Sequence, residues 1–131
     1  MARVRHAHSP IQIPLDRLQA FPSVLKPRVL WVGPSESWLQ SEPAKRLMAL
    51  HQELESCCHS FGFAPDEKPF SPHLTVARIK TGERQVGPLL AQSGVYERSV
   101  SLGTMTVGPV VLIKSQLRPT GPVYTKLWEV G

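Results

Sequence analysis

The chain has 131 residues, of which 41% are hydrophobic and 19% are charged, so it has the length and composition of a globular domain with a buried core. Fifteen Lys and Arg against ten Asp and Glu give a formal charge of +5, which either favours polyanionic partners or only keeps the domain soluble. No apolar run approaches the ~18 residues of a membrane span, and the first ten residues have no secretory-type apolar stretch. We therefore expect no membrane partner. Cys57 and Cys58 are adjacent and supply no disulfide framework, so we expect a cytoplasmic protein.

Residues 1–10 are basic and lack apolar periodicity, which predicts a flexible arm. His6 and His8 have no Cys or carboxylate nearby in sequence, so a solvated tail is favoured over a metal site. Residues 11–131 are expected to form a single domain.

The first part of this domain predicts two strands. Apolar residues alternate from Ile11, and Pro14 favours an edge strand or a bulge, in a segment that ends at Phe21-Pro22. The short apolar run over residues 28–33 is typical of a central strand.

Between Ser41 and Gly62 the apolar period becomes that of a helix. Ser41 is the expected N-cap, Pro43 lies in the first turn, and Gly62 suits a left-handed C-cap. The stripe that we expect to face the core consists of Leu47, Leu50, Leu54 and Phe61.

The second half predicts mainly strands. A strand is expected from His73 to about Lys80, and a short helix near residues 84–92 is interrupted by Gly87-Pro88. Three further strands are expected over residues 96–107, 110–117 and 123–130. Several strands with one long helix and no regular βαβ order predict an α+β fold built on antiparallel sheet.

The strand that begins at His73 carries the strongest chemical signal. Strand side chains alternate, so His73 and Thr75 share one face, while Leu74 and Val76 are expected to anchor the other face to the core. An imidazole can exchange a proton near neutral pH, and a hydroxyl two residues on can donate to a phosphoryl oxygen. The alternative, a half-buried strand histidine with a backbone partner, is favoured on this short spacing alone.

A longer series of motifs resembles a known family. In chain order the motifs are Ala20-Phe21-Pro22, residues 28–33, Gly62-Phe63, residues 69–78, residues 112–115 and residues 121–125. Together they are similar to the RNA 2′,3′-cyclic phosphodiesterases, also called 2′-5′ RNA ligases, of the two-histidine phosphoesterase superfamily. The resemblance runs from about Ile11 to the C-terminus.

This resemblance implies hydrolysis of a 2′,3′-cyclic phosphate to a 2′-phosphate without metal or cofactor, on RNA or a nucleotide. His73 matches a catalytic histidine of the family as general acid or base, and Thr75 matches the hydroxyl beside it. Arg78 matches a substrate-binding position. Its parity in a regular strand places it opposite His73 unless the strand twists or bulges.

The family carries two His-x-Thr/Ser motifs in two lobes, and this chain resembles the later part of the fold, without the first motif. One histidine cannot act on both sides of an in-line displacement. Three explanations stay open: a fragment of a longer product, a noncatalytic module that binds nucleotides or RNA ends, or a homodimer in which two copies of His73 share a cleft. A further alternative is an interaction domain whose basic surface is incidental. Trp31 and Tyr124 are expected in the core rather than in the site.

Overall fold

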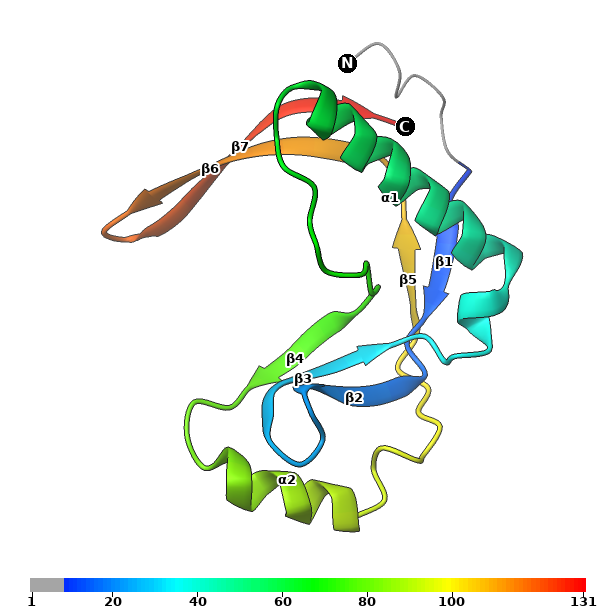
Figure 1. Cartoon of the computed structure of the whole chain (residues 1–131), viewed down its shortest axis with the longest axis vertical. Helices are drawn as coiled ribbons and strands as arrows, with labels where there is room; N and C mark the ends of the chain where they lie inside the picture. Colours follow the sequence, from blue (N-terminus) through cyan, green and yellow to red (C-terminus); the bar gives the residue numbers. More distant parts are fainter. Residues whose placement is uncertain (1–8) are drawn as a thin grey trace.

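The computed structural model describes residues 9–131, so the basic arm predicted for residues 1–10, with His6 and His8, lies almost wholly outside the described residues. Strands and helices alternate irregularly along the chain (Figure 1). Their order is β1 (Ile11–Pro14), β2 (Arg17–Pro22), β3 (Pro27–Gly33), a 3₁₀ turn (Trp38–Gln40), α1 (Glu42–Ser60), β4 (Leu74–Arg78), α2 (Glu83–Gln92), β5 (Thr104–Val107), β6 (Val110–Arg118) and β7 (Gly121–Val130). No helix in this part of the chain is long and apolar enough to cross a bilayer.

Every strand pair in residues 9–131 is antiparallel, and the strands form the groups β1-β5, β2-β3-β4 and β6-β7. The predicted α+β fold on antiparallel sheet is therefore confirmed. The prediction that residues 28–33 form a central strand is also confirmed, because β3 lies between β2 and β4.

The single strand predicted from Ile11 to Phe21 is wrong, because the chain changes sheets after Pro14. The Leu15 amide donates to the Gly103 carbonyl at 2.9 Å, whereas the Asp16 amide donates to the Gly33 carbonyl at 3.0 Å. The amides of two consecutive residues thus form hydrogen bonds on the sides of two different sheets. The β1-β5 pair packs under α1, where Ile11, Ile13 and Leu47 form a buried cluster.

Helix α1 begins and ends as predicted. The Ser41 hydroxyl accepts a hydrogen bond from the Ala44 amide, and Gly62 has a positive φ of 90°. Leu47 and Leu50 are buried, but Phe61 is 63% exposed, so its place in the core stripe is wrong. The helix has already ended at Ser60, and Phe61 is its C-cap.

Helix α2 continues through Gly87-Pro88, which corrects the predicted interruption. Proline removes only one donor, and tertiary packing outweighs that loss here. Gly87 lies against the segment between β2 and β3, where an added Cβ would be 2.1 Å from the Leu25 carbonyl oxygen. Close packing of two backbones therefore holds α2 on this sheet.

The C-terminal strands differ from the prediction in one respect. Residues 96–103 are irregular, and only Thr104–Val107 is a strand, paired with β1. The hairpin of β6 and β7 extends away from the rest of the molecule (Figure 1). Many of its apolar side chains are exposed, including Leu117 at 89% and Tyr124 at 67%, so the expected core position of Tyr124 is wrong.

Candidate functional site

His73 lies directly before β4, at the end of the loop from α1, so the strand begins one residue later than predicted. Its Nδ1 atom is 2.7 Å from the Ser71 carbonyl oxygen. A carbonyl oxygen can only accept a hydrogen bond, so Nδ1 must carry the proton. In the neutral ring Nε2 is then the atom with the free lone pair, as a general base requires.

Two aromatic rings hold the His73 ring. Phe21 and Trp31 both meet it edge to face, with centroid distances of 5.5 and 5.7 Å. Trp31 is 5% exposed, as predicted for a core residue, whereas His73 is exposed. The imidazole is therefore supported on one side and open to solvent.

A bulge in β4 decides the position of Arg78. Thr75 pairs with Trp31 and Ala77 pairs with Leu30, so Val76 is an extra residue in β4. Beyond it, Arg78 pairs with Val29. Cross-strand partners share a face and residues two apart on β3 do too, so Arg78 returns to the face of Thr75.

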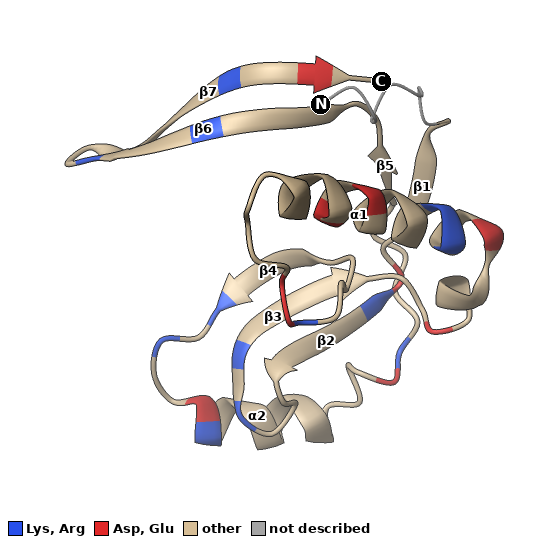
Figure 2. Cartoon of the chain, turned by 45° about the horizontal axis from the view of Figure 1, so that its top comes forward, with Lys and Arg blue, Asp and Glu red and all other residues tan. Residues whose placement is uncertain are grey.

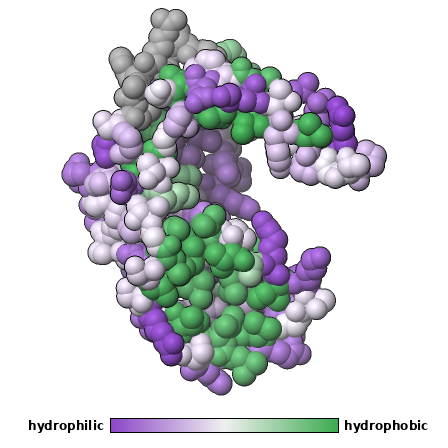
Figure 3. All heavy atoms as spheres, turned by 180° about the vertical axis from the view of Figure 1, so that it is seen from behind, coloured by the Kyte–Doolittle hydropathy of each residue, from purple (hydrophilic) through white to green (hydrophobic). Residues whose placement is uncertain are grey.

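The apolar side of β4 is not anchored as predicted. Leu74 is 46% exposed and Val76 is 51% exposed, so the expectation that they fix the strand to a core is wrong. A strand pattern states which side chains share a face but not what packs on that face. Within residues 9–131, β4 also pairs with β3 on one side only. Figure 3 shows a broad apolar area over the part of the molecule that contains this sheet and α2.

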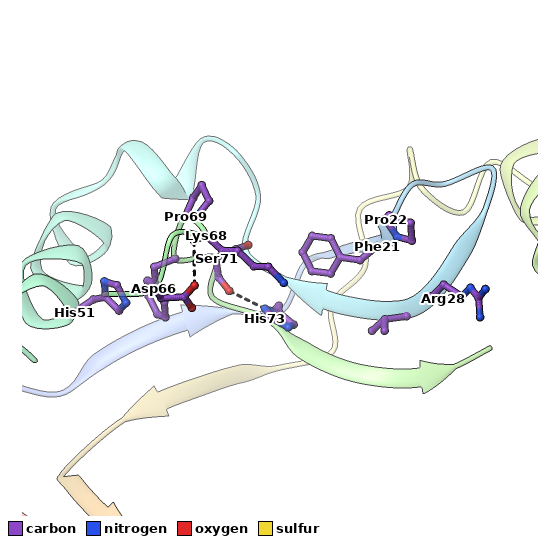
Figure 4. Close-up of a pocket in the computed structure, with 11 residues that line it drawn as sticks. Phe21, Pro22, Arg28, His51, Asp66, Lys68, Pro69, Ser71 and His73 are labelled. Carbon is purple, nitrogen blue, oxygen red and sulfur yellow. Dashed lines mark hydrogen bonds between the residues drawn. The ribbon is translucent and has the colours of Figure 1, made fainter. Parts of the chain in front are cut away.

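His73 lines a cavity of about 830 Å³ between the β2-β3-β4 sheet and the loop that follows α1 (Figure 4). The size is that of a small-molecule site. Its other lining residues are Phe21, Pro22, Arg28, Val29, His51, Asp66, Lys68, Pro69, Phe70 and Ser71. Thr75 and Arg78 are not among them, although the register places both on the sheet face that carries Phe21 and Val29.

The two ends of the cavity differ in charge and chemistry. At one end the Arg28 guanidinium lies 3.5 Å from the Glu83 carboxylate, and the Arg28 side chain is 60% exposed. At the other end the His51 ring stacks on Phe70 with a centroid distance of 4.4 Å. Lys68 lies between them, and within residues 9–131 its ammonium makes no ion pair.

Sequence reasoning missed Phe21, Arg28, His51 and Lys68 as cavity residues. Phe21 and Arg28 belong to motifs of the family resemblance, which was the available signal. His51 and Lys68 gave no signal, because α1 and its following loop approach β4 only in the folded chain. Within residues 9–131, no three His, Cys, Asp or Glu side chains are grouped to hold a metal ion.

Comparisons with known proteins show which family the chain is similar to. The model of the 2′-5′ RNA ligase superfamily matches residues 1–118. An RNA 2′,3′-cyclic phosphodiesterase of Aeropyrum pernix is 37% identical over 119 residues, which are 91% of this chain and 63% of that protein. One of Aquifex aeolicus is 36% identical over 122 residues, which are 92% of this chain and 60% of that protein.

The crystal structure of TT0787 of Thermus thermophilus shares the fold, with a TM-score of 0.57 and 26% sequence identity. The match covers 98% of this chain and 63% of TT0787. The chain thus spans about three fifths of the length of these relatives. Because the model of the 2′-5′ RNA ligase superfamily matches most of the chain, the chain belongs to this superfamily, the family that its motifs resemble.

Proposed function

We propose that the chain acts on RNA or nucleotides that end in a 2′,3′-cyclic phosphate, and that His73 is the general acid or base that opens the ring to a 2′-phosphate. The proposal rests mainly on one observation. The Nδ1 atom of an exposed histidine is hydrogen-bonded to a carbonyl oxygen, which leaves Nε2 free at the wall of a cavity whose charged lining residues are Arg28, Lys68 and Asp66. The relatives named RNA 2′,3′-cyclic phosphodiesterase support the choice of reaction.

In this reaction the oxygen of water forms a bond to phosphorus, and the bond from phosphorus to the 3′ oxygen breaks. As a base, Nε2 of His73 takes a proton from the water. As an acid, a protonated His73 gives its proton to the 3′ oxygen instead. The products are a 2′-phosphate and a 3′ hydroxyl, and neither proton transfer consumes a metal or cofactor.

Thr75 and Arg78 are proposed to stabilise the charge on the phosphoryl oxygens. The Thr75 hydroxyl donates a hydrogen bond, and the Arg78 guanidinium supplies positive charge. The bulge at Val76 supports the role of Arg78, because without it the side chain would lie on the opposite face of β4.

His73 can serve only one side of an in-line displacement, so a second proton donor or acceptor has to come from elsewhere. The second candidate function follows from this point. A chain that holds the phosphate through Thr75, Arg78 and Lys68 without a second group would bind nucleotides or RNA ends and turn over slowly or not at all.

The test uses adenosine 2′,3′-cyclic phosphate in the presence of EDTA, with the product followed by phosphorus NMR. We expect His73→Ala to lower the rate by about 100- to 10,000-fold, the range of a lost general acid or base. His59→Ala is the matched control, because His59 is exposed on α1 and lies outside the cavity. Equal turnover by wild type and His73→Ala would remove His73 from the mechanism.

A wild-type chain that forms no product but binds adenosine 2′-phosphate would favour the second candidate. That binding should weaken as salt is raised, since phosphate contacts release counterions. It should also raise the melting temperature, because a ligand of the native state stabilises it.

A further inference from the structure

Phe21 is an exposed aromatic residue whose ring is held in one orientation. Its ring stacks on Trp31 with a centroid distance of 5.2 Å and an interplanar angle of 24°. The Arg17 guanidinium lies 5.6 Å from the Trp31 ring and is itself paired with Glu36 at 3.3 Å. Despite these contacts Phe21 is 39% exposed, and it lines the cavity of His73.

The exposed ring lies next to the reactive histidine. The Phe21 and His73 centroids are 5.5 Å apart, and the two rings meet edge to face. In Figure 4 the Phe21 ring and the His73 ring border the same part of the cavity. The base and the phosphate of one nucleotide are joined through a single ribose, so two adjacent side chains can contact both.

Two basic residues, Arg28 and Lys68, line the cavity that holds this pair of rings, together with the acidic residue Asp66. In Figure 4 the Lys68 side chain points toward the gap between His73 and Phe21, while Arg28 lies beyond Pro22. In Figure 2 further basic positions gather where β3 begins, β4 ends and α2 begins. The Ile79 amide donates to the Arg28 carbonyl at 2.9 Å, so the end of β4 and the start of β3 are in contact.

Building on the proposed function, we propose that Phe21 is the platform on which the terminal nucleobase stacks while its phosphate lies at Nε2 of His73 beside Lys68. Stacking on an aromatic ring is tolerant of base identity, because every base has a π face. The last base of a blunt duplex has only one free face, its base pair fixes its position relative to the terminal phosphate, and unpairing it costs energy. The substrate class is therefore an RNA end whose last nucleotide is unpaired.

The experiment compares the affinities of two probes by calorimetry on the 131-residue chain. Adenosine 2′-phosphate carries a base and ribose 2-phosphate does not, so the ratio of their dissociation constants isolates the base. Loss of an aromatic contact to a base corresponds to about 5- to 150-fold in affinity. Since leucine keeps part of the contact, we expect Phe21→Leu to weaken adenosine 2′-phosphate about tenfold and to leave ribose 2-phosphate unchanged.

Three further variants separate stacking from other effects. Phe21→Trp keeps an aromatic ring and should keep the wild-type ratio, even if Phe21→Leu melts at lower temperature. Phe63→Leu is the matched control, because Phe63 is 67% exposed and lies outside the cavity. Lys68→Ala should weaken both probes by the same factor, since both carry the phosphate.

The proposal would be overturned if the ratio of the two dissociation constants were the same in wild type and in Phe21→Leu. It would also be overturned if the wild-type chain bound neither probe. A second arm uses RNA that ends in a 2′-phosphate. We expect a single-stranded 3′ overhang to bind at least about tenfold more tightly than a blunt duplex, and equal binding would contradict the proposal. A Phe21-dependent ratio without hydrolysis of the cyclic phosphate would support the platform and count against the proposed reaction alone.

Discussion

The contact between Gly87 and the segment before β3 predicts an unusually harmful Gly→Ala substitution. An added Cβ would be 2.1 Å from the Leu25 carbonyl oxygen, 2.4 Å from its carbonyl carbon and 2.9 Å from the Pro27 ring. Two of these atoms belong to backbone, which cannot turn away as a flexible side chain can. The substitution therefore requires α2 and the Leu25–Pro27 segment to separate.

Two opposing terms set the magnitude. In a helix, Ala is better than Gly by about 1 kcal/mol. Overpacking of a buried contact costs about 1–3 kcal/mol and more where the backbone must move. With a contact this short we take the upper end, so Gly87→Ala should lower the free energy of unfolding by about 2 kcal/mol or more. In a domain of this size that loss corresponds to a drop of about 6–10 °C in melting temperature.

Urea unfolding followed by circular dichroism measures this change. Gly108→Ala is the matched control, because nothing lies within 4 Å of its Cβ position and its φ lies outside the left-handed range. We expect this control to be as stable as wild type or about 0.4–1 kcal/mol more stable. Should Gly87→Ala unfold at the same urea concentration as Gly108→Ala, the described packing of α2 on β3 would be refuted.

Two further predictions concern alkaline stability and association. Burial raises the pKa of Tyr96 above its ordinary value of 10.0, and its hydroxyl has no partner within residues 9–131. The unfolded chain therefore loses this proton first, so stability falls as the pH rises from about 10 through the raised pKa. Tyr96→Phe should remove that loss. At pH 7 its free energy of unfolding should equal that of wild type or exceed it by up to about 1 kcal/mol. Urea unfolding at pH 7 and at a pH above about 10 would measure both effects. Exposed apolar residues on the hairpin, such as Leu117, and the one-sided pairing of β4 predict a homodimer at high concentration, which Leu117→Glu should weaken. Light scattering that finds only monomer at high concentration would leave the paired-cleft explanation without support.

Much of the local structure was predictable because it depends on neighbouring residues. Ser41 and Gly62 mark the ends of α1 by their capping chemistry, and the helical period places Leu47 and Leu50 in the core. The apolar run at β3 identifies a strand that is paired on both sides. In each case the signal is contained within a few turns or a few residues of chain.

The predictions of local structure and burial were wrong where contacts with segments distant in sequence decide them. The residues around Leu15 alternate as in one strand, yet consecutive amides bond to different sheets. Leu74 and Val76 have an apolar strand pattern, yet about half of each side chain is exposed. Alternation states which side chains share a face but not what covers that face.

By itself the sequence determined the antiparallel α+β class, the long helix and the family, and it contains the His-x-Thr spacing of His73 and Thr75. These properties depend on periodicity, capping and short motifs, and each of these signals comes from residues that are close together in the sequence. Only the tertiary structure decided that a bulge returns Arg78 to the face of Thr75, and that Ser71 orients the His73 ring. Only the fold brings Phe21, Lys68 and His51 to one cavity, because Phe21 comes from β2, which is far in sequence from α1 and from the loop that follows it.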